Sequence, residues 1–128
     1  MPLYTVTTQD GLLSAEQRDF IAAELVRIHT TINGVPANFV HSIFLTYPRD
    51  HAYVAGKRSP VASVLGIIRA GRAPEQKTRL VRALWRMFQD NTGVSDSDLS
   101  IALHEVAPSQ AMENGTIMPE IGHEKETS

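Results

Sequence analysis

Apolar residues follow the same order twice along this chain, and the first half shows the order clearly. Leu3–Thr8 alternates, with Tyr4 and Val6 on one face, as in a strand that buries one face. Ser14 and Gln17 stand three positions apart in a capping-box pattern, which predicts that a helix starts there. The apolar side of this helix recurs at helical spacing at Ile21, Leu25, Ile28 and Ile32, with Phe20 widening it.

The same order is repeated after a turn. Gly34 ends the first helix, since glycine accepts the left-handed conformation at a helix end, and Phe39–Tyr47 is the second predicted strand. The second half has a strand pattern over Val61–Ala70, a helix that ends at Gly93, and a last long strand over Leu99–Val106. The apolar side of that second helix consists of Leu80, Val81, Leu84, Trp85 and Phe88.

One sequence offset relates both ends of the two helices. Ala15 and Pro74, which open the helices, are 59 positions apart, and so are Gly34 and Gly93, which close them. A single offset that fits a start and a stop indicates a duplicated β-α-β unit, with right-handed crossovers that put both helices over one face of a shared sheet. The other face of this sheet also carries apolar side chains, which predicts an oligomer.

The expected fold class is therefore α+β, with tandem β-α-β units forming a mixed sheet and two helices on one face. We expect one domain over residues 1–122, with duplicated halves of about 2–59 and 61–118, and a loose polar tail over residues 123–128. The connecting segments are expected to hold a short hairpin strand at Tyr53–Ala55, one helical turn from Pro108 through Met112, and a short strand at Gly115–Met118.

Composition removes several classes of function. The net charge of −2 offers no basic face for nucleic acid, and the absence of cysteine excludes disulfides, thiolate metal sites and a cysteine nucleophile. The apolar runs are too short to cross a membrane, and the first ten residues lack the pattern of a signal peptide. We therefore expect a cytoplasmic protein without nucleic-acid or membrane partners.

Pro2 is the first candidate for chemistry. Removal of the initiator Met would leave Pro2 as the amino terminus, with a secondary amine whose unperturbed pKa is about 7.7–8. Such an amine takes and gives protons near neutral pH without a cofactor. If Met1 is retained, the Pro2 nitrogen is an amide and this role is excluded.

Arg69 and Arg72 are candidates for binding a carboxylate. They bracket the turn after the third main strand, and two guanidinium groups can each hold a planar carboxylate by two hydrogen bonds. They would also stabilise an enolate beside that carboxylate. By the symmetry of the repeat, the strand that ends at Arg69 is expected to run parallel to the one that starts at Pro2, and parallel sheets bind ligands at strand ends.

His29 and Glu113 are weaker candidates. His29 stands near the end of the first helix, where the helix dipole favours a charged imidazole and hence a carboxylate-binding role; a histidine at an amphipathic boundary is the plainer alternative. Glu113 follows the late turn and could activate water, although a single exposed Glu usually has no such role. The remaining histidines show no metal-ligand spacing, and we expect neither a metal nor a cofactor.

Together these features resemble the tautomerase superfamily (the fold of macrophage migration inhibitory factor) in its fused form, with two units in one chain. The closest pattern is that of the cis-3-chloroacrylic acid dehalogenase group, and it covers about residues 2–122. The matching stretches are Pro2-Leu3-Tyr4, His29, Ile68–Arg72 and Pro108–Gly115.

The resemblance implies a homotrimer with Pro2 in a pocket at the sheet end. In that group the Pro amine is the acid, a His and two Arg hold the substrate carboxylate, and a Glu with a Tyr activates water. Carried over, Pro2, His29, Arg69, Arg72 and Glu113 match. The Tyr does not, because its place falls on Ala102, and Asn114 stands where the group tends to have Tyr.

Three functions follow from these residues. The first is a cofactor-independent keto-enol tautomerase for small 2-oxo acids of the phenylpyruvate type, with Pro2 as acid and base and with Val35 and Phe39 shaping the pocket. The second is a hydratase or dehalogenase of three-carbon unsaturated acids, or the related decarboxylation of a malonate semialdehyde-type acid. The third is a non-catalytic oligomer that uses the Pro2 pocket only for binding.

Overall fold

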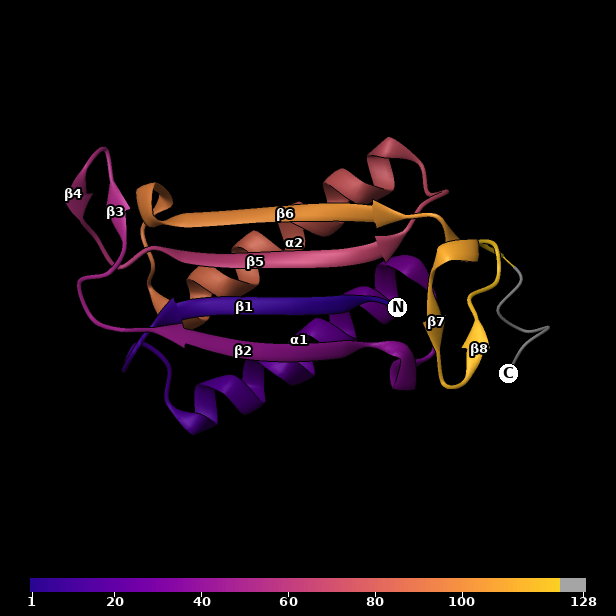
Figure 1. The fold of residues 1–128 in the computed structure, drawn as a ribbon, viewed down its shortest axis with the longest axis horizontal. Helices are drawn as coiled ribbons and strands as arrows, with labels where there is room; N and C mark the ends of the chain where they lie inside the picture. The colour runs from indigo at the N-terminus through magenta and orange to yellow at the C-terminus, as the bar shows by residue number, and fades with distance from the viewer. Residues whose placement is uncertain (123–128) are drawn as a thin grey trace.

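The repeated pattern folds into one four-stranded sheet with two helices packed on one side of it (Figure 1). The computed structural model describes residues 1–122, so the predicted tail over residues 123–128 lies outside the described residues. The main elements are β1 (Leu3–Gln9), α1 (Ala15–Asn33), β2 (His41–Tyr47), β5 (Ala62–Arg69), α2 (Pro74–Thr92) and β6 (Leu99–Val106). The α+β prediction, with two helices and a mixed sheet, is confirmed.

The strand order is β2-β1-β5-β6, and each β-α-β half forms a parallel pair. The two halves meet at β1 and β5, which run antiparallel, with Leu3 opposite Ile67 and Val6 opposite Val64. The expected parallel relation between these strands is therefore wrong. A local apolar pattern fixes which face of a strand is buried but carries no information on strand direction.

Both helices are bounded by local signals. Ser14 caps α1 with the reciprocal contacts of a capping box to Gln17, as the sequence predicts. Gly34 and Gly93 end the helices at φ values of 70° and 71°, in the left-handed region that favours glycine. Each helix has 19 residues. Their apolar sides and the inner face of the sheet form the core, which includes Tyr4, Val6, Ile21, Leu25, Val64, Leu80, Leu84 and Phe88.

The connecting segments differ in detail from the prediction. The strand expected from Phe39 begins only at His41, because Ala37–Phe39 (η1) forms a single 3-10 turn. Phe20 does not widen the buried side of α1, since it is 52% exposed. The shorter elements are β3 (Tyr53–Val54), β4 (Lys57–Arg58), η2 (Asp96–Asp98), η3 (Pro108–Gln110), β7 (Met112–Glu113) and β8 (Thr116–Ile117). The turn from Pro108 is thus shorter than expected, and Met112 belongs to a strand.

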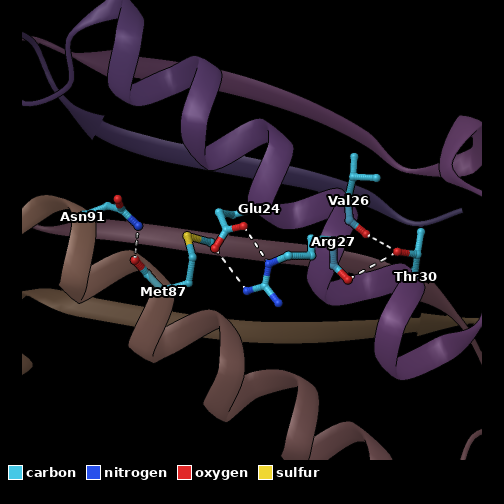
Figure 2. Close-up of polar contacts among 6 residues, drawn as sticks. All are labelled: Glu24, Val26, Arg27, Thr30, Met87 and Asn91. Atoms are coloured by element: carbon cyan, nitrogen blue, oxygen red, sulfur yellow. Dashed lines mark hydrogen bonds and ion pairs between the residues drawn. The ribbon is translucent and has the colours of Figure 1, made fainter.

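Several polar side chains on the helices form hydrogen bonds within their own helix. Arg27 donates from its Nε to Glu24 at 2.7 Å, and Thr30 donates to the carbonyl of Val26 at 2.8 Å; both contacts are drawn in Figure 2. On α2, Asn91 donates to the carbonyl of Met87 at 2.7 Å. Each of these drawn contacts stays within one helix. Within residues 1–122, no helix combines the length and the apolar character that a membrane crossing requires.

The opposite face of the sheet carries exposed apolar side chains. Ile43 and Leu45 on β2 are 47% and 50% exposed, and Leu65 on β5 is 39% exposed. Figure 1 shows both helices behind the sheet, so this outer face has no covering layer from the described chain. An apolar area of this kind is typical of a surface that contacts another protein chain.

Gly66 allows the sheet to pack around the Tyr4 ring, and its replacement should destabilise the protein. A Cβ at Gly66 would lie 2.7 Å from Tyr4 Cε1 and 3.1 Å from Leu103 Cδ2. We expect Gly66→Ala to lower the free energy of unfolding by about 1–3 kcal/mol, since the core would have to shift. Urea denaturation checks this, with Ser63→Ala on the same strand as the control. Equal stability of the two variants would contradict the packing described here.

Candidate active site

The antiparallel pairing of β1 and β5 brings Pro2 and Arg69 to the same end of the sheet. Leu3 pairs with Ile67, so continuing this register places the residues before β1 beside the last residues of β5. Pro2 is buried, and its carbonyl accepts a hydrogen bond from the backbone N–H of His41 at 3.0 Å. Figure 1 shows the amino terminus at this sheet end, near β7. Segments from both halves of the chain therefore meet around the amino terminus.

The two candidate arginines are buried at this end. Arg69 and Arg72 are only 2% and 7% exposed. Arg69 is the last residue of β5, and its Nη1 donates to the carbonyl of Pro119 at 2.7 Å, which ties the C-terminal segment to the site. Arg72 follows in the turn before α2. Buried guanidinium groups act strongly on neighbouring charges, because the surrounding dielectric constant is low.

The amino group of the full chain lies within this cluster. The Met1 amine forms an ion pair with Glu113 and approaches Met118 Sδ at 3.7 Å. Burial is the larger cause, and the charges of Arg69 and Arg72 the smaller one, of a lowering of the pKa of this amine to about 5. Burial and the arginines therefore favour the neutral amine, which can accept a proton, whereas the Glu113 carboxylate favours the charged form.

Glu113 reaches the amino terminus from a short hairpin. It is the last residue of β7, and its side chain is 13% exposed. Asn114 and Gly115 form the two-residue turn to β8, with φ values of 52° and 80°, which suits the Asn-Gly pair. The Oε2 atom of Glu113 also lies 3.5 Å from Nδ1 of His41. Asn114 is thus a turn residue, and Glu113 is largely buried and contacts the amino terminus; its role in activating water stays a prediction.

His29 is placed behind Tyr4 rather than at the surface. It is 1% exposed, and its Nδ1 lies 2.8 Å from the Tyr4 hydroxyl, with the two rings edge to face at 75°. Burial, followed by the charges of Arg72, the amino terminus and Arg69, lowers the pKa of His29 to about 3. This shift is opposite to the charged form that the helix dipole would favour, because burial and nearby cations outweigh the dipole.

The lowered pKa of His29 makes the stability depend on pH in a defined direction. The unfolded histidine titrates near 6.5 and the folded one near 3, so the unfolded state binds more protons between these values. As the pH falls from 6.5, His29 alone should reduce the free energy of unfolding by about 1.4 kcal/mol per pH unit. Urea denaturation from pH 7 to 4 tests this: His29→Gln should show the shallower slope. His51→Gln, at an exposed position, should keep the wild-type slope, and equal slopes for both variants would contradict the burial of a neutral His29.

The remaining predicted residues are Val35, Phe39 and Ala102. Val35 is buried and Phe39 is half-buried, both in the connection from α1 to β2, and their role in a pocket stays a prediction. Ala102 lies on β6 opposite Leu65, on the outer face of the sheet. Sequence reasoning missed the contacts that Tyr4, His41 and Met118 make with the candidate residues and the amino terminus. The available signal was Tyr4 itself, a hydroxyl-bearing side chain in a strand row that is otherwise apolar or small.

Comparisons with solved structures agree with this architecture. Native Ps01740 is 33% identical, with 87% of this chain and 99% of that chain covered and a TM-score of 0.84. N1, a member of the cis-3-chloroacrylic acid dehalogenase family, is 27% identical over 97% and 88% of the two chains, with a TM-score of 0.92. The fused 4-OT symmetric trimer Q0 is 21% identical over 91% and 94%, with a TM-score of 0.82, which shows the fold alone.

A search of curated protein sequences finds no significant relative. The family model described as "Putative oxalocrotonate tautomerase enzyme" matches residues 1–128. This match covers the whole length of the chain and agrees with the fold and with the buried site at the amino terminus. The chain belongs to this tautomerase family.

Proposed function

We propose that the protein is a cofactor-independent keto-enol tautomerase that acts on small 2-oxo acids of the phenylpyruvate type. In this proposal Met1 is removed, Pro2 is the acid and base, and Arg69 and Arg72 hold the substrate carboxylate. The observation that carries the proposal is the position of the amino terminus, which lies in a buried site with two arginines at the end of the sheet.

The electrostatics of the site support a Pro2 base. Burial and the two arginines lower the pKa of the Met1 amine to about 5. The same surroundings would act on a Pro2 amine one residue further along, because charged neighbours of the same sign disfavour the protonated form. A neutral secondary amine is the form that can take a proton from a substrate.

The proposed reaction moves one proton. The Pro2 nitrogen takes the proton from the enol hydroxyl, and the oxygen becomes an enolate that the arginines stabilise. The electrons of that oxygen then form the C=O bond, the carbon-carbon double bond takes up the proton from Pro2 at the neighbouring carbon, and the amine is restored. No atom is gained or lost, so no cofactor is needed.

A second function is favoured by one observation, the contact of Glu113 with the amino terminus. A carboxylate there could activate water for addition to a three-carbon unsaturated or halogenated acid, with Pro2 as the acid. The likeness to N1 supports this alternative. Ala102 argues against it, since the tyrosine that would share the water is missing.

Substrate preference together with Glu113→Gln distinguishes the two functions. We expect the processed protein, from which Met1 has been removed, to ketonise phenylenolpyruvate. The Glu113→Gln variant should ketonise it at a rate within a few-fold of the wild type, because the proposed proton transfer does not use water. Haloacrylate turnover should be absent or slow in both proteins. Fast haloacrylate turnover that is lost in Glu113→Gln would establish the second function instead.

We also propose that the chain assembles as a homotrimer. The exposed apolar side chains of Ile43, Leu45 and Leu65 support an interface on the outer face of the sheet. The trimeric state of the fused 4-OT protein Q0, which shares the fold, points in the same direction. Sedimentation equilibrium should give three times the chain mass, and a pure monomer would contradict the proposal.

A further inference from the structure

His29 belongs to a chain of hydrogen bonds that starts at Gln76 on α2, crosses to α1 and ends at Tyr4. Gln76 on α2 donates from its Nε2 to the carbonyl of Ile32 at 3.1 Å and to Oδ1 of Asn33 at 2.8 Å. The Nδ2 atom of Asn33 then lies 3.2 Å from Nε2 of His29. On its other side, Nδ1 of His29 lies 2.8 Å from the Tyr4 hydroxyl.

The direction of these bonds is fixed at the Ile32 carbonyl. A backbone carbonyl only accepts, so the Gln76 group that faces it must be the NH₂. The same NH₂ faces Asn33, which must therefore present its oxygen to Gln76 and its own NH₂ to His29. An NH₂ group cannot accept a hydrogen bond from an imidazole N–H. Nε2 of His29 is thus the acceptor and carries no proton.

We propose that Gln76 and Asn33 are positioning residues that hold His29 as the neutral tautomer with its proton on Nδ1. His29 then donates to the Tyr4 oxygen, and the Tyr4 hydroxyl proton is left for an oxygen of a ligand held near Arg72. Arg72 is close enough to Tyr4 for its charge to lower the pKa of the hydroxyl, against the larger raising effect of burial. For catalysis, this consequence rests on the proposed function; the tautomer itself does not.

The second half of the chain provides an internal comparison. Gln17, 59 positions before Gln76, donates to the carbonyl of Asn91, which is 59 positions after Ile32. Both halves therefore keep the amide-to-carbonyl contact between helices. Phe88 stands in the place of His29, and Thr92, in the place of Asn33, donates back to the Phe88 carbonyl at 2.7 Å. Only at His29 does this contact between helices continue to an imidazole side chain, since Phe88 stands at the equivalent position.

The tautomer is measured by NMR on the full chain with ¹⁵N-labelled histidine at pH 7. Long-range ¹H–¹⁵N correlation distinguishes the two ring nitrogens, and the His29 signals are assigned by their loss in His29→Gln. In the wild type we expect a proton on Nδ1 and none on Nε2. In Asn33→Asp, which has the same shape but offers only acceptors, Nε2 should acquire a proton, and the pKa of His29 should rise because of the new negative charge.

Two further variants distinguish an effect of the hydrogen-bond chain from an effect of helix packing. Gln76→Glu should also shift the proton toward Nε2, because Asn33 can then turn its oxygen to His29. Gln17→Glu, the matched control, keeps an acceptor for the α1 cap and should leave the His29 signals unchanged. A proton on Nε2 in the wild type, or its absence there in Asn33→Asp, would overturn the proposal. If the tautomer were unchanged in Gln76→Glu, Gln76 would have no part in the proposal. The same would follow if Gln17→Glu changed the tautomer as much as Gln76→Glu.

Discussion

Protein that retains Met1 is expected to ketonise phenylenolpyruvate about 10²–10⁴ times more slowly than protein that begins at Pro2. In the retained form the Pro2 nitrogen is an amide without basicity, and the Met1 amine forms its ion pair with Glu113 inside the site. Apart from Met1 itself, every side chain of the proposed site is the same in the two forms. The comparison therefore tests the free Pro2 amine together with the removal of Met1 from the site.

The two forms are separated by intact mass, and the rates are followed by ultraviolet absorbance. Thermal unfolding of both forms controls for folding, and it should show no loss of structure in the form with Met1. Equal rates would exclude Pro2 as the acid and base. If the protein keeps Met1 in its native form, a binding role at the same site becomes the better interpretation.

Loss of Arg72 should have the second largest effect. Arg72→Gln is expected to lower kcat/KM for phenylenolpyruvate about 10²–10³-fold, since it removes a buried cation from the developing enolate and from the carboxylate. Arg72→Lys should recover part of this loss, because lysine keeps the charge but not the planar pair of donors. Steady-state kinetics with each variant measures both effects.

Two controls make this prediction specific. Arg79→Gln, at an exposed position on α2, should leave kcat/KM within a factor of about two. An enol that lacks a carboxylate should lose much less rate than phenylenolpyruvate in Arg72→Gln. If both substrates lost the same factor, Arg72 would not be a carboxylate ligand, and its effect would be on the fold or on Pro2.

Local signals account for the parts of the fold that the sequence predicts well. Ser14, Gly34 and Gly93 bound the helices through capping geometry that depends on neighbouring residues only. The alternation around Tyr4 and Val6 identifies the buried face of β1. These features need no knowledge of the rest of the chain, because the hydrogen bonds and sterics involved are local.

The missing parts depend on contacts between distant segments. The antiparallel meeting of β1 and β5 has no local signature, yet it brings Arg69 beside the amino terminus. The neutral state of His29 results from burial and from the charge of Arg72, 43 positions away along the chain. The contact of Glu113 with Met1 likewise depends on the β7–β8 hairpin folding over the sheet end. Sequence reasoning found these candidates, and the fold supplied their charge states and neighbours.

The most direct test of the central claim is the rate of phenylenolpyruvate ketonisation by the processed protein and by its Pro2→Ala variant. Alanine keeps an amine but loses the ring that fixes its position in a buried site. We expect fast decay of the enol in the processed protein and loss of most of that rate in the variant. Decay no faster than in buffer, or an equal rate in the variant, would contradict it.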